Sequence, residues 1–163
     1  FMKLVSDWIY RLSIGLVCIL VGVLTFVTLL DVFARNVLGF SFTWAGELTR
    51  FLFIYTTFIG ASAVYKKLEL TGFDMITKKL PSAASQFIFK GMQLVIIAFC
   101  SIVIYSGIVS SFSKTLMLQH SPGLGISMTI PYLAIPIGMT FTLIHALAFL
   151  IHGHYNAPSN MTK

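Results

Sequence analysis

The sequence predicts an all-α integral membrane protein with four transmembrane helices. Of its 163 residues, 57% are hydrophobic and 10% are charged, whereas a soluble domain carries about 25% charged residues. Residues 12–30, 51–65, 91–113 and 115–162 contain no Asp, Glu, Lys or Arg. A helix crosses a bilayer with about 20 apolar residues. Because these runs lack the alternation of barrel strands, and only helices or closed barrels satisfy their backbone in lipid, we expect helices.

We expect one membrane domain over residues 1–163, with helices at about 8–33, 44–65, 86–113 and 129–151. The first run follows Lys3 and Arg11, as in a signal peptide, but it is longer and lacks a plausible cleavage site, which indicates a retained helix. The third helix exceeds 30 residues if it is continuous, so it must tilt or project from the membrane. Pro136 lies inside the fourth helix and should kink it.

The connections also carry structural signals. Gly39 is expected to turn the chain after the first helix, and Thr43 suits the N-cap of the second. In the second connection, Phe73, Ile76 and Leu80 follow helical spacing, which predicts a short amphipathic helix on the membrane surface. The third connection, residues 114–128, is mostly uncharged, contains Pro122, Gly123 and Gly125, and predicts a compact loop.

The distribution of basic residues predicts that both termini lie in the cytoplasm. Eight basic residues fall on the side of the termini: Lys3, Arg11, Lys66, Lys67, Lys78, Lys79, Lys90 and Lys163. Three fall on the other side, namely Arg35, Arg50 and Lys114. Cytoplasmic loops carry the excess of Lys and Arg. We expect Lys66, Lys67, Lys78 and Lys79 to face lipid head groups as basic anchors.

Several functional classes are disfavoured by the residues. The net charge of +6 reports orientation rather than a nucleic-acid partner, and no phosphate loop or nucleophile elbow occurs, so we expect no enzyme. Cys18 and Cys100 form no metal or redox motif. His145 lacks a histidine partner at its depth, which disfavours haem and favours a hydrogen-bonded packing histidine. No metal site or cofactor is expected in this chain.

Four charges flank the first outer turn. Asp31 and Arg35 are four residues apart, and Glu47 and Arg50 are three apart, so each pair can meet on its own helix. Three interpretations stay open: a structural clamp between the first two helices, an interface with another subunit, or an ion or substrate pathway. The absence of a carboxylate near mid-membrane argues against transport by this chain alone.

Two blocks resemble the small membrane subunit, DctQ type, of tripartite ATP-independent periplasmic (TRAP) transporters. The first block contains Arg35, Gly39, Trp44, Glu47 and Arg50, followed by Phe58-Ile59-Gly60-Ala61-Ser62-Ala63, Lys66 and Asp74. The second contains Ser121-Pro122-Gly123-Leu124-Gly125-Ile126-Ser127-Met128 and Ile135-Pro136-Ile137-Gly138. Gly46 replaces an acid common in the family, Leu70-Thr71 replaces a His-Ile pair, and Gly123 and Ser127 replace Ala and Pro.

The resemblance implies a scaffold in the bacterial inner membrane. In this family a large membrane subunit of M type holds the sodium and substrate sites and moves as an elevator, while a periplasmic binding protein delivers an organic acid. Sialic acid and C4-dicarboxylates are family substrates, and the substrate of this chain is not readable.

Residue roles follow from the resemblance as expectations. Asp31, Arg35, Trp44, Glu47, Arg50 and Gly60 are expected at a subunit interface or structural clamp. Lys114, His120, Ser121 and Pro122 are expected to contact the binding protein. Two alternative functions are a standalone small transporter and the membrane anchor of a redox complex.

Overall fold

The computed structural model describes residues 2–71 and 82–152. It confirms the all-α membrane class, with four helices long and apolar enough to cross a membrane. These are α1 (Met2–Phe33), α2 (Thr43–Thr71), α4 (Ser82–Ser111) and α6 (Thr129–His152). A π-helix, η1 (Ala34–Leu38), extends α1, and the short α5 (Lys114–Leu118) follows α4. The expected surface helix around Phe73, Ile76 and Leu80 lies outside the described residues.

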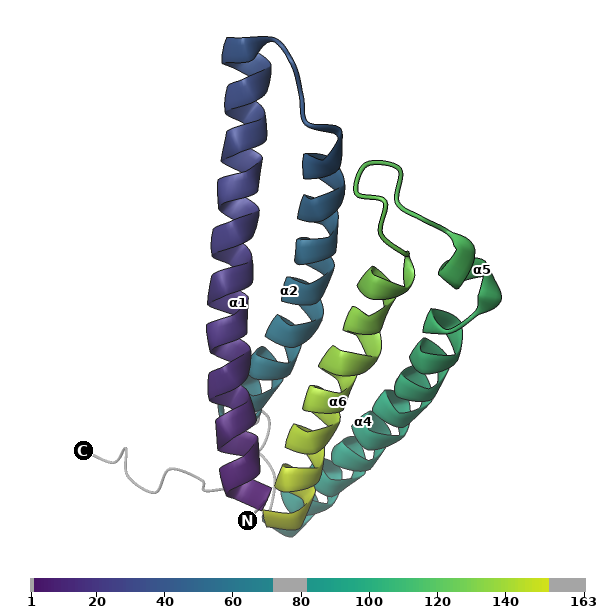
Figure 1. The fold of residues 1–163 in the computed structure, drawn as a ribbon. Helices are drawn as coiled ribbons and strands as arrows, with labels where there is room; N and C mark the ends of the chain where they lie inside the picture. Colours follow the sequence, from purple (N-terminus) through teal and green to yellow (C-terminus); the bar gives the residue numbers. More distant parts are fainter. Residues whose placement is uncertain (1, 72–81, 153–163) are drawn as a thin grey trace, which may run out of the picture.

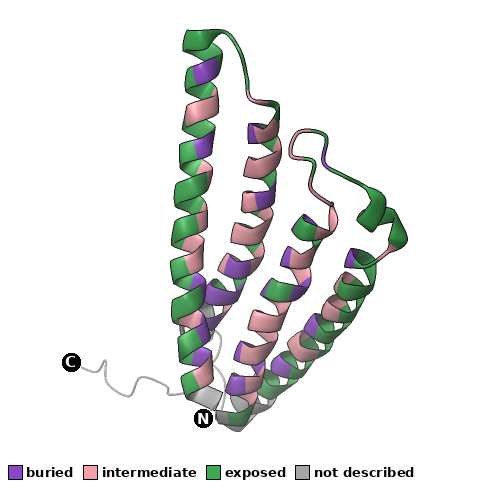
Figure 2. Ribbon diagram, in the orientation of Figure 1, coloured by how far each residue is buried: buried purple, intermediate pink, exposed green. Residues whose placement is uncertain are grey.

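The four long helices stand side by side in the order α1, α2, α6, α4 (Figure 1). Helix α6 is last in the chain but lies between α2 and α4. In the most apolar stretches of α6 and α2, 33% and 22% of the residues are buried, whereas the shares in α4 and α1 are 11% and 6%. Figure 2 shows the same contrast, with exposed residues predominating on α1 and α4. The molecule is therefore a row of helices with two inner and two outer members, and at one end of the row α1 also contacts α6 and α2 also contacts α4.

The row has two distinct ends. At one end lie Met2 of α1, the last residue of α2, the first residue of α4 and His152 of α6; we call it the termini end. At the other lie the α1–α2 turn and the α4–α6 loop; we call it the turn end. The helices converge toward the termini end and spread toward the turn end (Figure 1).

Small residues let α6 approach both of its neighbours. A Cβ atom on Gly138 would lie 2.6 Å from Cβ of Phe58 and 2.7 Å from the Phe58 carbonyl oxygen, so the backbones of α6 and α2 are nearly in contact. On the α4 side, a Cβ on Gly107 would lie 3.2 Å from Cδ of Pro136. Membrane helices associate closely where small residues remove side-chain bulk. The Ile135-Pro136-Ile137-Gly138 block thus packs α6 against α4 through Pro136 and against α2 through Gly138.

The turn between α1 and α2 does not begin where the α-helical geometry of α1 ends. The backbone continues as η1 through Leu38, and Gly39 then adopts φ +74°, a left-handed conformation that side chains disfavour. The expected turn at Gly39 is confirmed. The π-helical extension was not predicted from the sequence, and it carries Arg35 toward the turn end.

Candidate functional site: a polar junction at each end of the helix row

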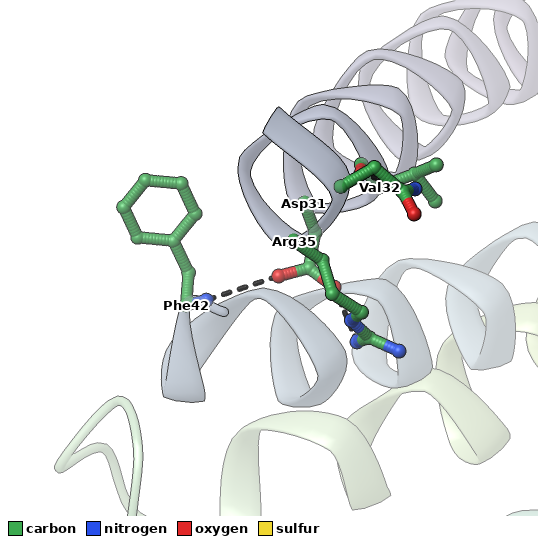
Figure 3. A network of polar contacts seen from close by, with 5 residues as sticks. Asp31, Val32, Arg35 and Phe42 are labelled. Atoms are coloured by element: carbon green, nitrogen blue, oxygen red, sulfur yellow. Dashed lines mark hydrogen bonds and ion pairs between the residues drawn. The ribbon is translucent and has the colours of Figure 1, made fainter. Parts of the chain in front are cut away.

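Asp31 fixes the corner between α1 and α2. Its Oδ2 accepts a hydrogen bond from Nη2 of Arg35 at 2.9 Å, and its Oδ1 accepts one from the backbone N–H of Phe42 at 3.0 Å (Figure 3). The Asp31 side chain is 16% exposed, whereas that of Arg35 is 66% exposed. Since an unpaired N–H near a helix start needs an acceptor, Asp31 serves as a link from α1 to the beginning of α2.

Glu47 on α2 binds the loop between α5 and α6. Its Oε2 accepts hydrogen bonds from the Ser121 hydroxyl, from Gly123 N–H at 2.9 Å and from Leu124 N–H at 3.1 Å. Successive backbone N–H groups in a turn form a concave site for an anion. The negative charge of Glu47 is therefore held by a loop more than 70 residues away in the sequence.

The conformation of this loop places the donors. Ser121 N–H donates to the Ile126 carbonyl at 2.8 Å, and Gly125 N–H donates to the Ser121 carbonyl at 2.8 Å. Gly125 has φ +67°, which closes the turn. Gly123 lies so close to the start of α2 that a Cβ there would be 2.8 Å from the Thr43 carbonyl oxygen. We call Asp31, Arg35, Glu47 and this loop, together with Phe42, the turn-end junction.

The four predicted charges are arranged differently from the expectation. The Asp31–Arg35 pair forms, but the expected pairing of Glu47 with Arg50 is wrong: the Glu47 carboxylate binds the loop, and the structure has no ion pair between these two residues. Three donors that converge on one oxygen of Glu47 hold it better than a single exposed side chain three residues away. Arg50 is exposed and lies outside the turn-end junction.

Other predicted residues take varied positions. Trp44 is half-buried, with its ring 5.4 Å from that of Phe42. Gly60 lies at the α1–α2 contact, where a Cβ would meet Val17 at 3.7 Å. Lys114, His120 and Pro122 are exposed near the turn end, but Ser121 is 2% exposed and bound to Glu47. Ser121 is thus an internal residue of the loop and not a surface contact.

Lys66 joins α2 to α1 at the termini end. Its Nζ lies 2.6 Å from Oδ1 of Asp7 and 5.1 Å from the ring centre of Tyr10. The Lys66 side chain is 11% exposed, so the expectation that it faces lipid is wrong: a carboxylate and an aromatic ring on α1 draw it inward. Lys67 is exposed, and Lys78 and Lys79 lie outside the described residues.

Two further hydrogen bonds connect helices at this end. Ser6 on α1 pairs with Nδ1 of His145 on α6 at 2.8 Å, and the Tyr65 hydroxyl on α2 donates to Oε1 of Gln93 on α4 at 2.6 Å. His145 and Gln93 are both fully buried. The predicted packing role of His145 is confirmed. We call these residues, with Asp7, Tyr10 and Lys66, the termini-end junction.

Most contacts of the termini-end junction were not predicted from the sequence. Gln93 is a polar residue within the uncharged run of residues 91–113, and Ser6 precedes the first uncharged run. A polar residue in a membrane span requires a partner. That signal was available, but it does not identify the partner. Within the described ranges no group of three His, Cys, Asp or Glu residues could hold a metal ion. Both junctions hold helices and loops together.

Comparison with known protein families matches residues 24–154 to the DctQ component of tripartite ATP-independent periplasmic transporters. No curated protein matches the chain. The matched segment contains the whole turn-end junction, including Asp31, Glu47 and Ser121. It also contains Lys66 and His145 of the termini-end junction, but begins after their partners Asp7 and Ser6.

Proposed function

The chain belongs to the DctQ family of TRAP transporter components, and we propose that it is the non-catalytic scaffold that supports the large subunit of a sodium-coupled importer. The row of helices is the observation that carries this proposal. A pathway through a membrane needs helices on all sides, whereas between 6% and 33% of the residues in the most apolar stretches of the four long helices are buried in the described part of the chain. Large apolar side chains such as Ile102 and Tyr105 are 68% and 74% exposed, which suits contact with lipid or with a second membrane protein.

We propose two partners with different tasks in transport, a large membrane subunit and a periplasmic binding protein. The large M-type subunit would hold sodium and an organic acid such as sialic acid or a C4-dicarboxylate, and would move as an elevator against this chain. A periplasmic binding protein would deliver that acid. We place the chain in a bacterial inner membrane with both termini on the cytoplasmic side. The exposed Lys114, His120 and Pro122 then face the periplasm and the binding protein.

The turn-end junction would contribute rigidity to the scaffold. Asp31 fixes where α2 begins relative to α1, and Glu47 fixes the loop that leads into α6. Trp44 and Gly60 both lie on α2, and Gly60 faces Val17 of α1. A moving subunit needs a stationary surface, and these contacts keep the faces of α1, α2 and α6 in one arrangement.

The test is co-purification of this chain with the co-expressed large subunit in mild detergent. Glu47→Ala removes the acceptor for the loop, and we expect a severalfold loss of the co-purified large subunit and of uptake in proteoliposomes. Lys114→Ala is the matched control for co-purification alone, because Lys114 is exposed at the turn end and is proposed to face the binding protein rather than the large subunit. Unchanged recovery and uptake with Glu47→Ala would remove the proposed role of the junction.

Outcomes with the chain alone separate this proposal from its alternatives. Uptake by this chain in liposomes without the large subunit would support a standalone transporter. A haem absorbance band in purified material would support a redox-complex anchor. A stable homodimer that never recovers a second membrane protein would contradict the scaffold.

A further inference from the structure

An apolar hollow of about 480 Å³ lies open between α2 and α6 near the turn end. Phe51, Ile54 and Phe58 form its α2 side, and Tyr132 and Ile135 belong to its α6 side. Both helices begin at the turn end, so residue numbers on both sides increase with depth into the membrane. The hollow therefore runs along the helices, and its volume is in the usual range of ligand sites, about 300–1,000 Å³.

Arg50 lies at the shallow end of the hollow and is the one charged residue among the described residues that line it. It is exposed, and it has no hydrogen bond or ion pair with the described parts of the chain. Glu47 is close enough to attract it electrostatically, but the contacts of Glu47 go to the loop. An arginine in a membrane span is costly unless it reaches the interface or an anion.

Arg50 lies about two helical turns from the turn end of the candidate membrane span of α2, Thr43–Lys67. It is the eighth residue of α2, so its Cα lies about 10 Å along the helix axis from Thr43. A long arginine side chain extends toward the membrane surface from that depth. The site thus has a cation near the interface and apolar walls below it.

We propose that this hollow binds one phospholipid, with its phosphate on the Arg50 guanidinium and one acyl chain between α2 and α6. The polarity order of the site is that of a phospholipid, since the anion lies at the interface and the hydrocarbon runs inward. A helix of a partner protein would need an acidic side chain placed at the same level, whereas every phospholipid in that leaflet supplies the phosphate there. The proposal goes beyond the scaffold role, because it assigns a ligand to this chain itself.

The lipid would fill a gap in the packing of the two inner helices. α2 and α6 touch deeper in the membrane at Phe58 and Gly138, and the Tyr55 hydroxyl donates to the Ile130 carbonyl at 2.7 Å near the turn end. The hollow lies among these contacts. A bound acyl chain there adds apolar contact along both helices. It leaves in place the Tyr55–Ile130 hydrogen bond and the close approach of Gly138 to Phe58.

The experiment is native mass spectrometry of the full chain in detergent, titrated with phosphatidylglycerol and, separately, with diacylglycerol of the same acyl chains. Arg50→Gln should weaken phosphatidylglycerol binding about fivefold, the effect of one basic residue near a lipid phosphate. Arg50→Lys should retain most of the binding. Ile54→Trp should fill the hollow and abolish lipid binding. Lys114→Gln is the control for an exposed cation outside the hollow.

Three results would overturn the proposal. One is equal phosphatidylglycerol binding by the wild-type chain, Arg50→Gln and Ile54→Trp, which would place the lipid elsewhere on the surface. Another is equal binding of diacylglycerol and phosphatidylglycerol, which would remove the role of the phosphate. The last is efficient cross-linking of Ile54→Cys to the co-purified large subunit with no retained lipid, which would make a protein helix the occupant. Arg50→Gln changes an exposed residue, so the test stands even where Ile54→Trp does not fold.

Discussion

The two ends of the helix row are held by different kinds of contact. At the termini end, side chains of one helix bond side chains of another, as in Lys66–Asp7, Ser6–His145 and Tyr65–Gln93. At the turn end, Asp31 and Glu47 bond backbone N–H groups of the connections. The first end therefore fixes helices relative to one another, and the second fixes mainly the turns that join them. One direct bond near the turn end, from the Tyr55 hydroxyl of α2 to the Ile130 carbonyl of α6, also joins two helices.

This difference agrees with the shape of the row. The helices converge where buried side chains join them directly and spread where loops intervene (Figure 1). His145 and Gln93 are fully buried, and a buried polar group without its partner is costly, so the termini-end bonds restrict the helices strongly. Glu47 and Asp31 lie nearer the surface, where their effect is on local structure.

The largest effect is expected at the contact of Gly138 on α6 with Phe58 on α2, which lies between the turn end and the termini end. Gly138→Val places a side chain where Phe58 already lies, so α2 and α6 must separate, at a cost of about 3 kcal/mol of unfolding free energy. Denaturation in detergent micelles measures it. Gly22→Val is the control, because nothing lies within 4 Å of that position, and its effect should stay within about 0.5 kcal/mol. Equal loss in both variants would argue against the close approach.

Asp7→Ala tests the termini end. It leaves the Lys66 ammonium, on a side chain that is 11% exposed, without its carboxylate. We expect a loss of about 2 kcal/mol, below the value for a fully buried pair because Asp7 itself is half-exposed. The double variant Asp7→Ala/Lys66→Met removes the orphaned charge and should recover most of the loss. If the double variant is less stable than Asp7→Ala, the ion pair is not the source of the effect.

Glu47→Gln tests whether the turn end acts locally. The amide keeps an acceptor oxygen but loses the charge that three loop donors share. Hydrogen exchange of the Gly123 and Leu124 amides should become severalfold faster, while exchange near Lys66 stays unchanged. Faster exchange at both ends would mean that the two junctions unfold as one cooperative unit and that the turn end does not act locally.

The smallest effect is expected for Asp31→Asn. The Arg35 side chain is 66% exposed, and exposed ion pairs contribute about 0–1 kcal/mol, so the loss in detergent denaturation should be about 0.5 kcal/mol or less. The asparagine oxygen still accepts from Phe42 N–H. Asp31→Ala removes that acceptor as well and should cost about 1 kcal/mol. A loss for Asp31→Asn as large as that for Asp31→Ala would mean that Asp31 acts through its ion pair with Arg35 and not through its hydrogen bond to Phe42.

Much of the turn-end junction was predictable from local sequence. Asp31 and Arg35 are one helical turn apart, and Gly39 marks the corner. The partner of Glu47 was not predictable, because Ser121 is 74 residues away and only the packing of α6 beside α2 brings its loop there. For the same reason the burial of Lys66 escaped prediction, since Asp7 lies on another helix.

The sequence by itself determined the membrane class, the four spans and the position of the first turn. Transfer of a helix into lipid depends on its own composition, so each span can be recognised alone. The tertiary structure decided that α6 lies between α2 and α4 and that Glu47 holds a loop. Lipid is as apolar as the helix surfaces, so hydropathy cannot choose neighbours; the fit of Gly138 to Phe58 and of Gly107 to Pro136 does.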